Sequence, residues 1–180
     1  MYITTSRSPS SETIRLATLL SIVLPFSVFV RRGIKTFDKI LAGARRKGMN
    51  RVLFVTDENG KPGYLRIIAA SQYDWNDIGM YKIKKAKLPE IEIKELKKLK
   101  GQNGSNGLKS KQDKPNKSNI FFKCDKASCE LLGIEKNVSE MFSDTDTKIT
   151  FTGAKMKKLK IKTAEFEMGL GLEKIKSGKN

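Results

Sequence analysis

Small polar and cationic side chains gather at two points early in the sequence, each directly after a run of β-forming residues. One group follows residues 2–5 and the other follows residues 27–30. The six candidates are Ser6, Arg7, Ser8, Arg31, Arg32 and Lys35. Arginine binds a phosphate through a fixed fork of N–H donors, whereas lysine acts as a mobile point charge. These residue types therefore indicate phosphate binding, although the glycine-rich pattern of a Walker loop is missing.

The surrounding residues predict the elements that position these two groups. Residues 2–5 and 27–30 are expected to be strands, with a largely buried helix between them that ends near Leu24. Ser8 is expected to cap that helix, with Pro9 at its first position. If the two strands are parallel neighbours, both loops leave the same edge of the sheet, where open α/β sheets bind ligands. The free N–H groups of the first helix would add to this anion site.

A second helix is predicted directly after the second basic group. Thr36 is a good N-cap, Asp38 suits the first turn, and Gly48 suits the position after the last turn. Arg45 and Arg46 fall in that last turn and have two interpretations. They can stabilise the helix C-terminus through its dipole, or they can contact RNA.

The composition excludes several classes of enzyme and favours a polyanionic partner. The 180 residues carry a net charge of +17 and contain no histidine and two cysteines. Without histidine there is no Ser/His or Cys/His nucleophile pair, and two cysteines cannot complete a zinc site. We therefore expect no enzyme, no metal, no cofactor and no small-molecule substrate. Low cysteine usage suggests a reduced, cytoplasmic protein.

The distribution of charge points to the first third of the chain. All eight arginines lie at or before Arg66. Two other function classes stay open at this stage. One is a general RNA- or tRNA-binding protein, and the other is an RNA-directed enzyme that would need a carboxylate–metal site. Residues 1–56 offer only Glu12 and Asp38 for such a site. A Lys-rich surface with no nucleic-acid partner is the further alternative.

The rest of the chain predicts an α/β protein in two parts. Residues 52–56 and 64–70 read as strands around a turn at 57–63, which contains Asn59-Gly60 and Pro62-Gly63. Trp75 is expected to anchor a loop, and Tyr81 and Ile83 to lie on an edge strand. Residues 71–100 give no single assignment. The predicted organisation is an N-terminal half, 1–100, a flexible linker, 101–119, and a smaller C-terminal half, 120–180.

The C-terminal half is expected to be rich in β-structure. Strands are predicted at 120–124, 148–152, 158–162 and 166–173, with a short helix at 126–133. Cys124 and Cys129 are interpreted as small buried side chains. Residues 16–30 carry no charge, but Pro25 interrupts them and they are too short to span a bilayer, so no membrane partner is expected.

At residues 3–11, 24–25 and 30–33 the sequence resembles the opening of the Brix domain. The match continues through 52–57 and the turn near Gly60 and Gly63. The chain is most similar to the archaeal branch, in which the domain stands alone, and to the small-subunit processome member among eukaryotes. Near the C-terminus the family often carries Gly-Pro-Arg, where this chain has Gly169, Leu170 and Gly171.

The resemblance implies a fold and a function beyond those that composition suggests. It implies a single Brix domain over residues 1–180, with two similar layered halves. Each half would be a mixed sheet packed with helices, like an anticodon-binding domain. It also implies a non-catalytic ribosome biogenesis factor that binds ribosomal RNA or its precursor and assists its processing, with ribosome assembly proteins as further partners.

Overall fold

The computed structural model of this chain describes residues 1–24, 26–88, 120–124, 147–152, 158–162 and 167–175. The elements of the first part are β1 (Tyr2–Thr5), α1 (Ser11–Val23), β2 (Val28–Phe29), α2 (Phe37–Arg46), β3 (Arg51–Glu58), β4 (Lys61–Ala70) and β5 (Trp75–Lys87). The later elements are β6 (Ile120–Cys124), β7 (Thr147–Thr152), β8 (Lys158–Lys162) and β9 (Glu167–Ile175).

All of these strands belong to one mixed sheet. Its order is β2-β1-β3-β4-β5-β9-β8-β7-β6, and the first three strands are parallel. The α/β class is as predicted, and the strands of both predicted halves lie in one continuous sheet. Strands β5 and β9 pair along most of their length and join the two groups of strands. The predicted linker at 101–119 and helix at 126–133 lie outside the described residues.

Helix α1 begins two residues later than predicted. Its N-cap is Ser10, whose side chain accepts a hydrogen bond from the Thr13 N–H group, so Ser8 and Pro9 stay in the preceding loop. The reason is a contact that the local pattern does not contain. The Asp57 carboxylate accepts hydrogen bonds from both the N–H and the hydroxyl group of Ser10. This contact fixes Ser10 in the extended backbone conformation of a cap.

Helix α2 follows its sequence signals closely. Thr36 is the N-cap, Asp38 lies in the first turn, and Gly48 has a φ of 65° beyond the C-terminus. Ile40, Leu41 and Ala44 are buried on one side of the helix. Their spacing of three and four residues places them on one stripe, which explains why a short helix can dock on the sheet.

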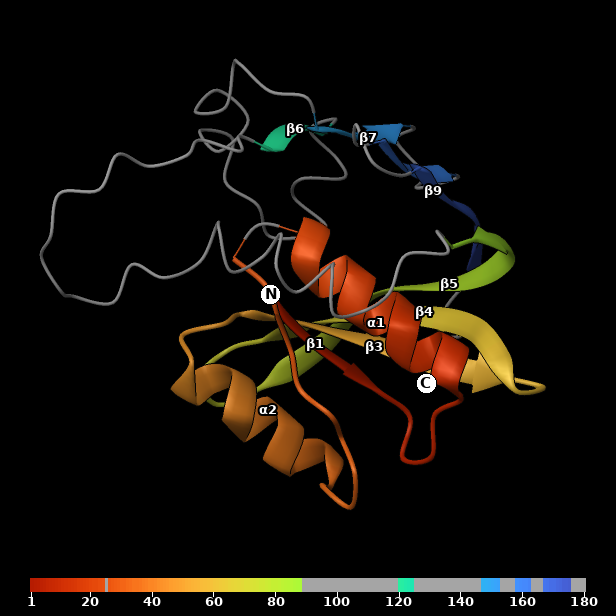
Figure 1. Ribbon diagram of the computed structural model, residues 1–180. Helices are drawn as coiled ribbons and strands as arrows, with labels where there is room; N and C mark the ends of the chain where they lie inside the picture. Colours follow the sequence, from red (N-terminus) through yellow and green to blue (C-terminus); the bar gives the residue numbers. More distant parts are fainter. Residues whose placement is uncertain (25, 89–119, 125–146, 153–157, 163–166, 176–180) are drawn as a thin grey trace, which may run out of the picture.

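The two helices cover opposite faces of the first strands (Figure 1). Leu53 and Val55 of β3 pack in the cluster that contains α1, whereas Val52 and Phe54 pack with α2. Successive side chains of a strand point to opposite faces, so β3 is buried on both sides. The result is a layered α/β/α arrangement around β1 and β3.

The hairpin between β3 and β4 is tighter than predicted. Asn59 and Gly60 have φ values of 54° and 75° and form the whole two-residue turn. Pro62 and Gly63 therefore already lie within β4, not in the turn. A Cβ atom at Gly63 would lie 2.3 Å from the Glu58 Cβ atom, so the close approach of the two strands requires glycine here.

Strand β5 is an interior strand, which corrects the prediction of an edge. It pairs with β4 on one side and with β9 on the other. Tyr81 and Ile83 are buried against α1, together with Leu170 and Leu172 of β9. Trp75 also belongs to β5 and not to a loop. The partner of β5 comes from residues about ninety positions later, so local sequence gave no sign of it.

In the part of the chain that the structure describes, no helix has the length and apolar character needed to cross a membrane. The uncharged stretch at 16–30 is divided between the buried side of α1 and strand β2.

Candidate nucleic-acid interface

The two basic loops predicted from the sequence meet at one edge of the sheet. Strands β1 and β2 are adjacent and parallel, so the loops that follow them leave from the same end. The side chains confirm that the loops lie close together. Burial lowers the pKa of Arg32, and the positive charge of nearby Arg7 lowers it further. We call Arg7, Arg31, Arg32 and Lys35 the basic corner.

The second loop of the basic corner holds its own shape. The Lys35 ammonium donates to the Arg31 carbonyl at 3.0 Å, and the Arg32 Nε group donates to the Lys35 carbonyl at 3.3 Å. The Arg32 guanidinium also lies 5.7 Å from the centre of the Phe54 ring. These contacts orient Arg32 before any ligand binds, while Arg7, Arg31 and Lys35 are exposed.

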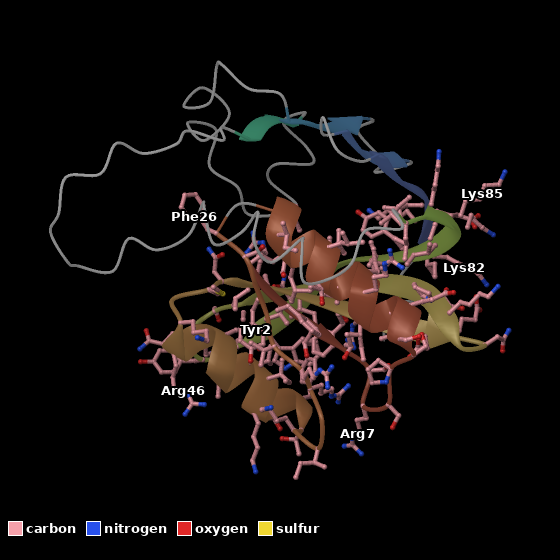
Figure 2. All side chains as sticks on the ribbon, viewed as in Figure 1. Tyr2, Arg7, Phe26, Arg46, Lys82 and Lys85 are labelled. Atoms are coloured by element: carbon pink, nitrogen blue, oxygen red, sulfur yellow. The ribbon has the colours of Figure 1, made fainter. Side chains whose placement is uncertain are left out.

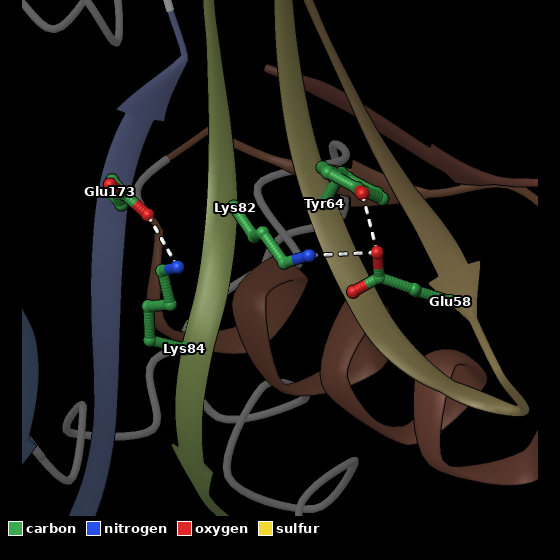
Figure 3. A network of polar contacts seen from close by, with 5 residues as sticks. All are labelled: Glu58, Tyr64, Lys82, Lys84 and Glu173. Atoms are coloured by element: carbon green, nitrogen blue, oxygen red, sulfur yellow. Dashed lines mark hydrogen bonds and ion pairs between the residues drawn. The ribbon is translucent and has the colours of Figure 1, made fainter.

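The cations of the basic corner have no carboxylate partner among the described ion pairs. Those pairs join Arg66 to Asp77, Lys82 to Glu58, and Lys84 to Glu173. Figure 3 shows the last two pairs, which join β5 to Glu58 of β3 and to Glu173 of β9; Tyr64 of β4 also donates to Glu58. Two lysines of β5, Lys82 and Lys84, are thus paired with acids, whereas no described ion pair balances the positive charge of the basic corner.

The serines of the first loop differ in their surroundings. Ser8 is exposed, whereas the Ser6 hydroxyl donates to the Asp57 carboxylate at 3.0 Å. Asp57 also accepts from the hydroxyl groups of Ser10 and Thr13. Burial opposes the ionisation of Asp57, but the hydrogen bonds from Thr13, Ser10 and Ser6 outweigh it and lower its pKa.

This network places the chain's own carboxylate at the N-terminus of α1. The positive end of the helix dipole and the cap donors are therefore already used by Asp57. An incoming phosphate would meet the guanidinium and ammonium groups of the basic corner first. The sequence predicts that the N–H groups of α1 take part in anion binding. In the structure Asp57 occupies that helix end, so the cations of the basic corner are the groups left to bind an anion.

Arg45 and Arg46 lie at the far end of α2 from the basic corner. The Arg45 guanidinium donates to the carbonyl groups of Ser71 and Asp74, at 2.6 and 3.0 Å, and so connects α2 to the turn before β5. Arg46 is exposed and is well separated from Arg7 in Figure 2. The geometry gives Arg45 a structural contact and leaves Arg46 outside the corner.

The acidic residues considered for an RNA-directed enzyme do not form a site together. Glu12 lies in the first turn of α1 and Asp38 in the first turn of α2, and both are exposed. The described residues contain no group of three or more side chains that could hold a metal ion.

No protein-family model matches the sequence. Residues of this chain are 32% identical over 88 positions to a probable Brix domain-containing ribosomal biogenesis protein of Pyrococcus horikoshii, covering 49% of this chain and 39% of that protein. A protein of the same description from Saccharolobus solfataricus is 37% identical over 92 positions, covering 49% and 51%. The resemblance to the Brix family is confirmed.

The chain spans about half the length, or less, of these curated Brix relatives. The likeness in fold to two solved structures covers almost the whole of this chain, whereas the sequence matches cover about half of it. A probable ribosomal biogenesis protein from Aeropyrum pernix K1 has a TM-score of 0.64 at 18% identity, covering 98% of this chain and 96% of that one. An archaeal Imp4-like protein has a TM-score of 0.57 at 18% identity, covering 96% of both.

The Brix resemblance rested on residues whose structural roles are now visible. Ser6 and Ser10 bind Asp57, and Arg7, Arg31 and Arg32 form the corner. Where Brix proteins often carry proline, this chain has Leu170, which is buried in the core and lies in β9. The chain therefore uses that position for packing.

Sequence reasoning missed two features of the site. Asp57 comes directly after the strand predicted at 52–56 and lies near the end of β3, but its partners lie more than forty positions earlier. The aromatic cluster of Phe54, which lies beside Arg32, with Phe37 and Trp75 was also missed, because these rings come from β3, α2 and β5 and meet only in the folded sheet.

Proposed function

We propose that this protein is a non-catalytic ribosome biogenesis factor that binds ribosomal RNA or its precursor through the basic corner. The observation that carries the proposal is the meeting of Arg7 with Arg32 at one sheet edge, without a carboxylate partner among the described ion pairs. The names of the Brix relatives and the net charge of +17 support the same function.

The chemistry of the corner suits a phosphate backbone. Arginine can donate two parallel hydrogen bonds to one phosphate, and the loop contacts hold Arg32 in place in advance. Each phosphate that the protein neutralises releases counterions, so binding weakens as salt rises. With about five phosphates neutralised, the logarithm of affinity should fall with the logarithm of salt at a slope near −3.5 for single strands.

The wider role follows from the same proposal. The protein would act in the cytoplasm and assist RNA processing and subunit assembly together with assembly proteins, without a cofactor, membrane or small-molecule substrate. We further propose that it consists of two related halves, each like an anticodon-binding domain. Strands β6, β7, β8 and β9 pair in the same order and with the same directions as β1, β3, β4 and β5, which supports this idea.

The proposal is tested by the binding of precursor ribosomal RNA segments, transfer RNA and duplex DNA at matched salt. We expect the ribosomal segments to bind most tightly. Replacing Arg31 and Arg32 by alanine should weaken binding and make the salt slope shallower by roughly one to one and a half units. Equal affinity for all three nucleic acids would instead indicate a general RNA- or tRNA-binding protein.

A matched control uses lysines from the predicted linker. Replacing Lys109, Lys111, Lys114 and Lys117 by alanine removes more charge than the double arginine variant. It should nevertheless cost less affinity, because isolated lysines give diffuse attraction. A larger loss in the lysine variant would show that the corner is not the binding site. Crosslinking in cells, followed by sequencing of the bound RNA, would identify the ribosomal segment.

A further inference from the structure

A row of three aromatic side chains with an arginine at each end extends from the basic corner across the α2 side of the sheet. The Arg32 guanidinium lies 5.7 Å from the Phe54 ring centre, and Phe54 stacks on Phe37 at 5.6 Å. Phe37 meets the Trp75 ring edge-on at 4.9 Å. The Arg66 guanidinium lies over both of these rings, at 5.7 Å from Phe37 and 5.8 Å from Trp75. The row therefore connects the corner to Trp75 without a break.

The inner and outer members of this row differ in exposure. Phe54 is buried and Phe37 is half-buried, so these two rings serve as the base of the row. Trp75 remains 39% exposed, and the Arg66 side chain 36% exposed. An exposed indole leaves a large apolar surface in water, which is unfavourable unless a partner covers it. At the outer end of the row, part of the Trp75 and Arg66 side chains is thus open to solvent.

Arg66 is held in one orientation. Its Nε and Nη2 groups donate to the two oxygens of Asp77, at 2.7 and 2.6 Å. Such a paired hydrogen bond fixes the plane of the guanidinium, so a fixed cationic plane lies beside the indole, with its centre 5.8 Å from the Trp75 ring centre. Aromatic rings and arginine planes are the surfaces on which unpaired bases stack.

The acids beside Trp75 do not block this use. Asp77 is paired with Arg66, and the Asp74 carboxylate accepts a hydrogen bond from the backbone N–H group of Trp75 at 2.6 Å. They still disfavour a phosphate at this end of the row. The charges therefore favour phosphates at the basic corner and an uncharged base at Trp75.

We infer that Trp75 and Arg66 form a stacking site for an unpaired base of RNA whose phosphates lie in the basic corner. This inference rests on the proposed function, because the row supplies the stacking and the corner supplies the charge. A single strand presents base faces, whereas an A-form duplex hides them within its stack. The site would therefore give the protein a preference for loops and unpaired junctions over helical RNA.

The sole tryptophan makes the inference directly measurable. A short unstructured RNA and a blunt RNA duplex of the same length are titrated into the full chain. Anisotropy of dye-labelled RNA reports total binding, and indole fluorescence with unlabelled RNA reports contact at Trp75. We expect the single strand to quench Trp75 with the same dissociation constant that anisotropy gives, and the duplex to bind with little quenching.

Two substitutions separate stacking from folding. Trp75→Ala should weaken single-strand binding by roughly 5- to 100-fold and duplex binding much less. Trp75→Phe keeps a flat ring and should retain most of the affinity, which covers the case in which the alanine variant unfolds. Phe26→Ala is the matched control, because Phe26 is 78% exposed, precedes β2 and lies away from Arg7 in Figure 2. It should leave both affinities unchanged.

The outcomes distinguish this inference from the proposed function. If RNA binds but leaves the fluorescence unchanged, or if Trp75→Ala binds the single strand like the wild type, the stacking site is wrong and the corner alone binds RNA. Equal quenching by single strand and duplex would also overturn it. If no RNA binds in either assay, the proposed function itself fails. An assembly protein that covers Trp75 would give the first of these results.

Discussion

Replacing Asp57 by alanine should destabilise the protein well beyond an ordinary surface substitution. The Asp57 carboxylate accepts hydrogen bonds from the Ser10 N–H group and from the hydroxyl groups of Ser6, Ser10 and Thr13. It therefore joins the end of β3 to the first turn of α1. Alanine removes the acceptor and leaves four donors at a half-buried site, together with the positive end of the helix dipole.

The magnitude follows from the number and kind of these bonds. A hydrogen bond to a charged group contributes about 1.5 to 3 kcal/mol when it is buried. Asp57 is half-buried, so water can replace some of the lost partners. We expect a loss of about 2 to 4 kcal/mol in the free energy of unfolding. For a chain of 180 residues this corresponds to a fall in melting temperature of roughly 6 to 12 °C.

Denaturant unfolding at neutral pH measures this loss, and a double-mutant cycle with Thr13→Val isolates one bond. The coupling between the two positions should be about 1 kcal/mol or more. The wild type should also lose stability in acid. The folded pKa of Asp57 is below its ordinary value of 3.8, so its contribution is complete above that pH and disappears as the pH falls through the folded pKa. A change within ~0.5 kcal/mol for Asp57→Ala would refute the role of this carboxylate.

Three further variants test other parts of the structure. Replacing Arg31 and Arg32 by alanine should change the free energy of unfolding by about 1 kcal/mol or less, because Arg31 is exposed and Arg32 makes only a loop hydrogen bond and a contact with the Phe54 ring. A larger loss in denaturant unfolding would assign them to the fold. Gly63→Ala should lower the free energy of unfolding by about 1 to 3 kcal/mol, because a Cβ atom there would lie 2.3 Å from the Glu58 Cβ atom. Gly171→Ala is the control and should be tolerated, because its nearest atom lies at 3.7 Å. Equal losses of stability in the two variants would contradict this reasoning. An insertion of about ten residues between Gly101 and Asn119 should leave a single cooperative melting transition, and loss of cooperativity would mean that this stretch is packed.

Local sequence signals were sufficient where an element depends on its own residues. Thr36, Asp38 and Gly48 set the ends of α2, and Asn59-Gly60 forms the hairpin turn. Local sequence signals failed where a residue distant in the sequence determines the structure. Ser10 became the cap of α1 because Asp57 binds it, and β5 became an interior strand because β9 pairs with it. Such contacts require the register of the whole sheet, which no short window contains.

The candidate site shows the same division. The meeting of the two basic loops could be predicted, because parallel neighbouring strands end at one edge. The role of Ser6 could not, because its partner Asp57 lies on β3. Trp75 reaches Phe37 and Arg66 only through a strand pairing that contains a β-bulge between Ile67 and Ile68. An irregularity of this kind changes which side chains share a face and cannot be read from alternation alone.

The position of β9 has a consequence for how the protein is made. Strand β9 lies in the middle of the sheet, next to β5, and supplies Leu170 and Leu172 to the core beneath α1. A ribosome completes residues 1–88 long before it reaches residues 167–175. During that interval the nascent chain presents an open edge at β5, and Tyr81 and Ile83 lack the contacts of Leu170 and Leu172. Such edges pair readily with other chains. Synthesis therefore passes through an aggregation-prone stage, which ends only when β9 is made and pairs with β5.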